Sequence, residues 1–290
     1  MALRTTFTLA AASLAFMASA PLSACAQSPE DAEWVPIASE NILLIDTEKG
    51  LITVELNPDF APNHVARMQE MAEQGVINGE RFYRVIEGFV AQGGLADEEK
   101  ISVWSEVENE NDRPYGGAGF VPLGNADMFA PEVGHIDGFP VGRDESLDQE
   151  WLLHCPGAMA MARGVDPDSG STEFYIVLDA QRYLDRNLTV FGRVIDGMEN
   201  VQALQRGKRE IANGVIQPPE QGDLIHTFQI ASNLPEGEQL QWEKMDTASA
   251  AFEAFKTNKR VREDEFFYRK PPEILDICSF GAPARKVEAE

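Results

Sequence analysis

Residues 81–94 constrain the fold of this chain more than any other segment. Their sequence is RFYRVIEGFVAQGG, in which apolar and polar residues alternate before a glycine pair. Side chains separated by an even number of residues lie on the same face of a strand, so Arg84 and Gln92 can share one surface of a sheet. Phe89 has an odd spacing from both residues, and it joins them only if the chain bends at Gly88. The segment predicts strands that carry an arginine and a glutamine on one face.

Further strands are predicted on both sides of this segment. Residues 42–45 and 51–56 are apolar or alternating and are separated by Glu48-Lys49-Gly50, a pattern typical of a β-hairpin. His226, Phe228 and Ile230 alternate as in a closing strand.

Two helices are predicted among these strands. Pro62 can occupy the first turn of a helix whose apolar stripe ends at Gly75, and a second stripe begins at Met198 and ends at Gly207. Strand hairpins with just two helices favour a closed antiparallel barrel that the helices cap at its ends.

The segment at 81–94 resembles the signature of the cyclophilin family of peptidyl-prolyl isomerases, which runs roughly F-H-R-x-I-x-G-F-x-x-Q-G-G. Residues 157–176 and 184–198 resemble two further blocks of that family, in the same order. The resemblance covers residues 41–233, which we take as the isomerase domain. It implies a mainly β fold, with a closed eight-stranded antiparallel barrel capped by two α-helices.

The same resemblance implies the site residues. Arg84 matches the catalytic arginine of the family, which polarises the prolyl nitrogen, and Gln92 matches a glutamine that holds the substrate backbone through an amide that donates and accepts. The remaining positions around the bound peptide are Phe89, Val90, Ala162, Arg163, Glu173, Tyr175, Tyr183 and Leu188. The implied partners are proline-containing polypeptide segments.

Rotation about an X-Pro bond needs weaker amide resonance, and neither a nucleophile nor a metal is required. The four histidines are scattered, and Cys155 and Cys278 lack the spacing of a zinc motif. We therefore expect no cofactor and no metal site.

Several site residues depart from the family pattern. Tyr175 replaces a phenylalanine, and its hydroxyl needs a partner if it is buried. Glu173 replaces a glutamine and could pair directly with Arg84. Tyr183 stands where cyclosporin-sensitive members have tryptophan, which predicts weak cyclosporin binding, and Leu188 stands where many members have histidine. These changes leave an alternative open, namely a non-catalytic peptide-binding or chaperone module of the cell envelope.

The N-terminal residues predict export. Residues 1–25 combine Arg4 with an apolar, small-residue run, as in a secretory signal. Leu22-Ser23-Ala24-Cys25 resembles a bacterial lipobox, in which Cys25 is lipidated, whereas Ala24-Cys25-Ala26 also fits ordinary cleavage. We favour a periplasmic lipoprotein that meets the membrane only through this anchor, with residues 26–40 as a tether. The formal net charge of −24 disfavours nucleic acid as a partner.

Two regions exceed a cyclophilin core. Residues 95–155 contain an insertion, although the resemblance implies that part of this segment supplies a core strand. Residues 234–290 form a C-terminal extension, with a helix predicted from Leu240 through Phe252 and an aromatic run at 266–268 that we expect to pack on the barrel. Export to an oxidising compartment would allow Cys155 and Cys278 to form a disulfide, but two separate thiols are equally compatible with the sequence.

Overall fold

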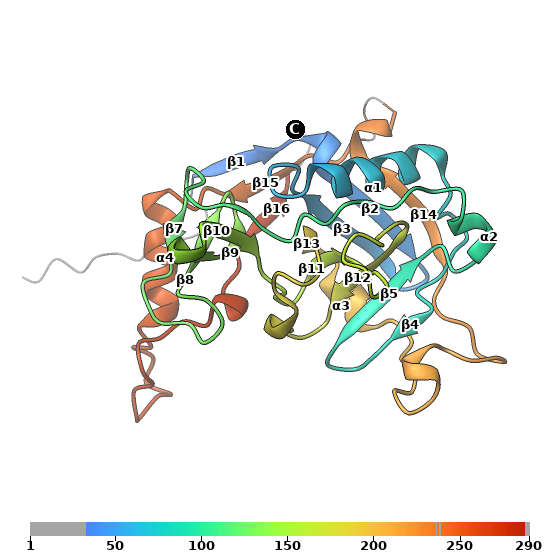
Figure 1. The fold of residues 1–290 in the computed structure, drawn as a ribbon. Coiled ribbons are helices and arrows are strands. Elements are labelled where there is room, and N and C mark those ends of the chain that lie inside the picture. The colour runs from blue at the N-terminus through green and yellow to red at the C-terminus, as the bar shows by residue number, and fades with distance from the viewer. Residues whose placement is uncertain (1–32, 236, 238, 288–290) are drawn as a thin grey trace, which may run out of the picture.

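The computed structural model describes residues 33–287 except 236 and 238, so the predicted signal segment and Cys25 lie outside the described residues. An eight-stranded antiparallel sheet forms the body of the molecule (Figure 1), with the order β14-β2-β3-β13-β11-β12-β5-β4. Its strands are β2 (Ile42–Thr47), β3 (Gly50–Leu56), β4 (Arg84–Val85), β5 (Val90–Gly94), β11 (Ala158–Met161), β12 (Glu173–Val177), β13 (Val190–Asp196) and β14 (Ile225–Ile230). The predicted hairpin, β2 with β3, and the predicted closing strand, β14, are confirmed.

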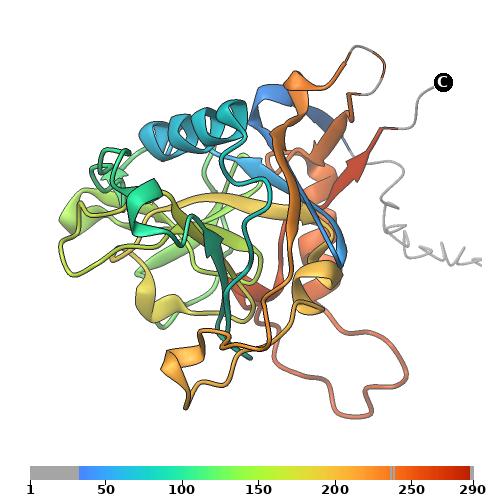
Figure 2. The same cartoon turned by 90° about the vertical axis from the view of Figure 1, so that its right-hand side faces the viewer.

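The sheet curls so that its two edge strands approach each other (Figure 2). Backbone hydrogen bonds at the start of β14 and before β4 form the join: Phe82 N donates to Asp223 O at 3.0 Å, and Ile225 N donates to Glu80 O at 2.8 Å. The mainly β, eight-stranded prediction is therefore confirmed, while β4 and β14 meet without a regular strand pair.

Helices cover the curled sheet. The predicted first helix is α1 (Pro62–Gln74), which ends where Gly75 takes a left-handed conformation with φ of 64°. The second is α3 (Met198–Gln202), which stops well before the predicted end at Gly207, although Leu204 is still buried. A further short helix, α2 (Glu98–Ile101), follows β5.

The main core lies between the inner face of the sheet and these helices. Because strand residues alternate between faces, Val85, Ala91 and Phe174 point inward from β4, β5 and β12 and are fully buried. Met68 and Met71 of α1 close the same core. The strand residues that alternate with these inward-facing ones form the outer face of the sheet.

The insertion folds into a second sheet, with the order β6-β10-β9-β8-β7. Its strands are β6 (Arg113–Pro114), β7 (Val121–Pro122), β8 (Glu132–Ile136), β9 (Phe139–Asp144) and β10 (Gln149–Leu152). None of these strands joins the main sheet, so the expectation of a core strand from residues 95–155 is wrong. The reason is that β5 pairs directly with β12, which leaves no gap for another strand.

The insertion sheet packs on the outer face of the main sheet. Phe139, Val141 and Leu152 share a buried cluster with Ala160 of β11 and Val177 of β12. The insertion is thereby joined to the face that also carries Tyr175.

The C-terminal extension forms a third sheet with the segment that precedes the main sheet, in the order β1-β15-β16. Its strands are β1 (Trp34–Ile37), β15 (Trp242–Met245) and β16 (Ala284–Lys286). The predicted tether at 26–40 is therefore corrected, since residues 34–37 are a strand. The predicted helix is also corrected, because residues 242–245 are extended and the helix is α4 (Ala250–Arg260), capped by Ser249.

Charged side chains attach this extension to the main sheet. Glu55 of β3 is only 2% exposed and accepts from Arg193 Nε at 2.8 Å and from Lys244 Nζ at 2.6 Å. Short 3₁₀ turns complete the fold at Ser39–Asn41, Glu145–Leu147, Arg182–Leu184, Ala212–Gly214, Ala231–Asn233 and Ile277–Ser279.

A disulfide between Cys155 and Cys278 joins the end of the insertion to the extension, which settles the question that the sequence left open. The aromatic run at 266–268 does not pack on the barrel as expected. Phe266 is 83% exposed and Tyr268 is 88% exposed, in a loop that projects from the body in Figure 2.

Candidate active site

Three of the predicted site residues lie in one row across the outer face of the main sheet. Arg84 of β4 is directly opposite Gln92 of β5, and Gln92 is directly opposite Tyr175 of β12. Opposite residues in an antiparallel pair project from the same face. The shared face that the spacing predicted is therefore present, and Tyr175 extends it.

Two contacts hold the guanidinium of Arg84. Nη1 donates to Oε1 of Gln92 at 2.9 Å, and Nε donates to the carbonyl oxygen of Asn213 at 2.9 Å. Among the described residues, Nη2 has no hydrogen-bond partner, so its N–H groups are available to a bound peptide. Burial lowers the pKa of Arg84 from its usual value, and the nearby charge of Arg209 acts in the same direction.

The predicted bend at Gly88 brings Phe89 to this arginine. Gly88 has φ of 63°, a left-handed conformation that favours glycine, and Ile86 N donates to Val90 O at 2.9 Å across the turn. The guanidinium carbon of Arg84 consequently lies 5.7 Å from the centre of the Phe89 ring. Arg209, which the sequence analysis did not single out, lies at the same distance from that ring.

Gln92 continues the hydrogen bonding away from Arg84. Its Nε2 donates to the hydroxyl of Tyr83 at 2.8 Å, and that hydroxyl donates to Oε1 of Glu173. Glu173 therefore reaches Arg84 through Tyr83 and Gln92, and the direct pair that the sequence left open is not formed. Burial, followed by the Glu173 carboxylate, raises the pKa of Tyr83.

The role of Tyr83 was missed for a structural reason. Alternation places it on the face opposite Arg84, but β4 begins at Arg84, so Tyr83 is free of that constraint. The hydrogen bond from Arg84 to Asn213 was missed because its acceptor is a backbone carbonyl, and the pattern of side chains in a sequence does not predict such acceptors.

The apolar residues predicted around the proline ring lie together. Val90 and Tyr175 are buried in the cluster on the outer face, and Phe89, Ala162 and Leu188 pack against it while partly exposed. The hydroxyl of Tyr175 has the partner that its burial requires, since it lies 2.9 Å from Nε2 of His154. Burial raises the pKa of Tyr175.

The last two predicted residues lie at the margin of this cluster. Arg163 donates to the carbonyl oxygen of Asn187 from Nε at 3.1 Å and from Nη2 at 2.7 Å, which joins the turn after β11 to the segment before Leu188. Tyr183 is 62% exposed in the 3₁₀ turn Arg182–Leu184. Within the part of the chain that the structure describes, no group of three or more His, Cys, Asp or Glu residues is arranged to hold a metal ion.

Comparisons with known proteins agree with this architecture. The family model described as cyclophilin type peptidyl-prolyl cis-trans isomerase/CLD matches residues 42–229. A probable peptidyl-prolyl cis-trans isomerase of Brucella suis is 30% identical over 183 residues, which is 62% of this chain and 79% of that protein. Peptidyl-prolyl cis-trans isomerase B of Bacillus subtilis is 30% identical over 165 residues, 57% of this chain and 89% of that protein. The chain therefore belongs to the cyclophilin-type peptidyl-prolyl cis-trans isomerase family.

The similarity extends beyond the isomerase core. The crystal structure of the cyclophilin AquaCyp293 from Hirschia baltica matches with a TM-score of 0.73 and 26% identity, covering 89% of this chain and 94% of that one. Because residues 42–229 are a smaller share of the chain, this match also extends beyond them.

The geometry explains how such a site acts. Amide resonance sets a barrier of about 18–20 kcal/mol to rotation of an X-Pro bond. In the role that the resemblance implies for Arg84, an N–H directed at the prolyl nitrogen would favour a pyramidal nitrogen and weaken that resonance, and a charged donor of this kind supplies about 2.7–4 kcal/mol. A rate gain of about 10⁵ needs about 7 kcal/mol, so the apolar cluster must contribute by holding the proline ring and excluding water.

Proposed function

We propose that this isomerase acts on proline-containing segments of exported proteins, in the periplasm, as a lipoprotein anchored through Cys25. The disulfide between Cys155 and Cys278 is the observation that carries the proposal. Disulfides form and persist in oxidising compartments and are rare in the cytosol. The signal-like composition of residues 1–25 agrees with this location.

The arrangement of the site supports polypeptide segments as clients. The row from Arg84 to Tyr175 lies on an outer face of the sheet rather than inside the barrel, and Nη2 of Arg84 has no partner among the described residues. A chain that passes over this face can place one proline ring on the apolar cluster while its backbone continues on either side. The strongly acidic surface implied by a net charge of −24 disfavours nucleic acid and favours solubility.

Mass spectrometry of the mature protein, produced in a bacterial host and separated into membrane and soluble fractions, tests the location and the anchor. We expect an N-terminal Cys25 that carries acyl chains, in the membrane fraction, and a C25S variant that moves to the soluble fraction. A wild-type protein that retains residues 1–25 and remains in the cytoplasm would refute export, and a mature but unacylated N-terminus would refute the anchor alone.

Among the helices that the structure describes, none has the length and hydropathy of a membrane span.

A further inference from the structure

His154 follows the last strand of the insertion and lies beneath the site. Its side chain is completely buried, and its ring stacks on the ring of Tyr175 with centroids 6.1 Å apart and an interplanar angle of 19°. Nε2 is 2.9 Å from the hydroxyl of Tyr175, and Nδ1 is 3.1 Å from Oδ1 of Asp185. A buried histidine thus separates a residue of the predicted proline pocket from a carboxylate.

The carboxylate determines the direction of these hydrogen bonds. Asp185 accepts from Arg182 Nε at 2.6 Å and from the backbone N–H of His154 at 2.9 Å, and a carboxylate can only accept. In a neutral imidazole, Nδ1 of His154 therefore carries the proton toward Asp185, and Nε2 presents its lone pair. With this tautomer, the hydroxyl of Tyr175 donates to His154.

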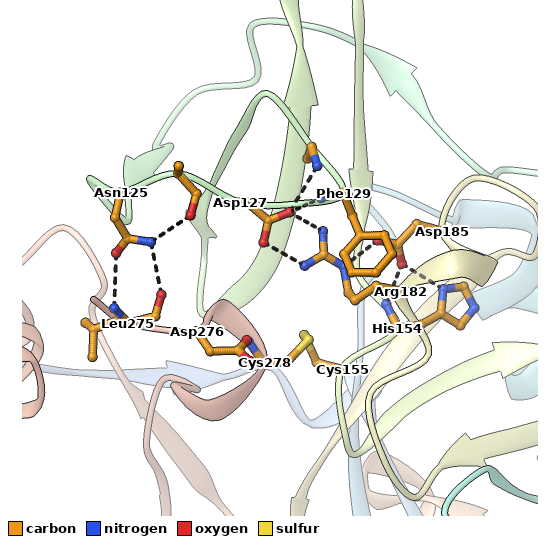
Figure 3. Close-up of polar contacts among 12 residues, drawn as sticks. Asn125, Asp127, Phe129, His154, Cys155, Arg182, Asp185, Leu275, Asp276 and Cys278 are labelled. Carbon is orange, nitrogen blue, oxygen red and sulfur yellow. Dashed lines mark hydrogen bonds and ion pairs between the residues drawn. A yellow bond between two sulfur atoms is a disulfide. The ribbon is translucent and has the colours of Figure 1, made fainter. Parts of the chain in front are cut away.

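A further ion pair connects this group to the insertion (Figure 3). Nη1 and Nη2 of Arg182 each lie 3.1 Å from a carboxylate oxygen of Asp127, and the guanidinium lies 5.3 Å from the centre of the Phe129 ring. The residue after His154 is Cys155, which the disulfide joins to Cys278. The position of His154 is therefore fixed from both sides.

We infer that His154 is a positioning residue of the isomerase, which holds Tyr175 in place beneath the proline ring by accepting its hydroxyl proton in a hydrogen bond. The hydroxyl is thereby directed away from the substrate, so that the tyrosine presents an apolar ring face as a phenylalanine would. Through Asp185, Arg182 and Asp127, the same hydrogen bond ties the pocket to the insertion. The inference rests on the isomerase activity of the family.

Four proteins test this role: the wild type, Y175F, H154L and the double variant H154L/Y175F. Proline isomerisation in an Ala-Pro tetrapeptide is measured by NMR exchange, with kcat and KM determined separately. Y175F should lose less activity than H154L, because it keeps the aromatic ring in place and removes only the hydroxyl. H154L should lose about 10–100-fold in kcat/KM, because the buried hydroxyl loses its acceptor and the ring shifts. The double variant should return to within about threefold of Y175F, because no hydroxyl remains to be satisfied.

Each alternative outcome contradicts the inference. Full activity in H154L would show that Tyr175 needs no partner, and a double variant as impaired as H154L would show that His154 acts through the general fold. A large loss in Y175F alone would place the hydroxyl against the substrate.

A spectroscopic measurement keeps the test valid if H154L does not fold. The ¹⁵N resonances of His154 should identify a neutral ring protonated at Nδ1, and Y175F should shift the Nε2 resonance while leaving Nδ1 nearly unchanged. An Nε2 resonance that is identical in the wild type and Y175F would overturn the inference. An inactive wild type with this NMR signature would instead count against the isomerase activity and leave the pairing intact.

Discussion

Arg84 and Gln92 face each other across the β4–β5 pair, and the arginine donates from Nη1 to the amide oxygen of the glutamine at 2.9 Å. Because the amide nitrogen of Gln92 donates to Tyr83, the oxygen end of the amide is the one that meets the guanidinium. One side chain thus orients the arginine and leaves Nη2 to the substrate.

Replacement of Arg84 by alanine should lower kcat/KM for a proline peptide by about 10²–10³, the usual cost of removing one donor aimed at the reacting atoms. The fold should persist, since the side chain is only partly buried. A protease-coupled assay together with circular dichroism checks both points. R84K is the matched control, and it should recover little activity because an ammonium cannot reproduce the two contacts of the guanidinium. Unchanged turnover in R84A would remove the role assigned to Arg84.

Replacement of Tyr83 by phenylalanine should reduce kcat/KM by about tenfold, because Nε2 of Gln92 loses its acceptor and the amide is no longer held in one orientation. The reduction should appear mainly in kcat, since Tyr83 acts on Arg84 and not on the substrate. E173Q is the companion variant, and it should have a smaller effect because a glutamine oxygen can still accept from Tyr83. Equal activity of Y83F and the wild type would show that the chain from Glu173 does not orient Arg84.

The buried Tyr175 and the partly buried Tyr83 predict a loss of stability in alkali. Tyr83 and Tyr175 both have a raised pKa in the folded protein, chiefly through burial, whereas the pKa of an unfolded tyrosine is about 10. Below pH 10 both states are protonated and the tyrosines have no pH-dependent effect. Above it the unfolded state releases protons first, so the free energy of unfolding falls by about 1.4 kcal/mol per pH unit for each tyrosine.

Urea unfolding between pH 9 and 11 measures this slope, in the wild type and in Y175F. The phenylalanine variant should show the shallower fall, by the contribution of one tyrosine. Parallel curves for the two proteins would mean that the pKa of Tyr175 is not raised.

Removal of the disulfide should destabilise the fold by about 2–5 kcal/mol. The disulfide closes a long loop, so its loss raises the conformational entropy of the unfolded chain. The two cysteines are 123 residues apart in sequence, and both lie in or against the apolar cluster between insertion and extension. Denaturant unfolding with and without reductant checks the change. The variant C155A/C278A is the control, and its midpoint should not respond to reductant.

Cyclosporin should bind weakly, because Tyr183 occupies the position at which sensitive cyclophilins have tryptophan, and its side chain is largely exposed. Isothermal titration should show an affinity well outside the nanomolar range. Y183W should tighten binding by about tenfold or more, since a large aromatic ring adds buried contact at the rim of the site. Nanomolar binding to the wild type would contradict this prediction.

The local patterns of the chain predicted part of the main sheet. Alternation predicted the β2–β3 hairpin and β14, and the even spacing between Arg84 and Gln92 predicted their common face. These features follow from the two-residue period of a strand, which is visible in the sequence without knowledge of the partner strand.

The same reasoning failed where contacts come from distant segments. Residues 242–245 have a loose helical period but pair with β1 and β16, so the pairing partner outweighed the local pattern. The insertion was expected to lend a strand to the main sheet, and it packs on the outer face instead.

The sequence by itself determined the family and the shared face of Arg84 and Gln92, because motifs and strand alternation are short-range features, and the family resemblance supplied Tyr175. Only the tertiary structure decided how those residues are held. Tyr83 stands between Gln92 and Glu173, and His154 satisfies the hydroxyl of Tyr175, although His154 and Tyr175 are 21 positions apart. Hydrogen-bond partners of this kind depend on which elements pack together in the folded protein. The periodicity of residues along the chain does not indicate this packing.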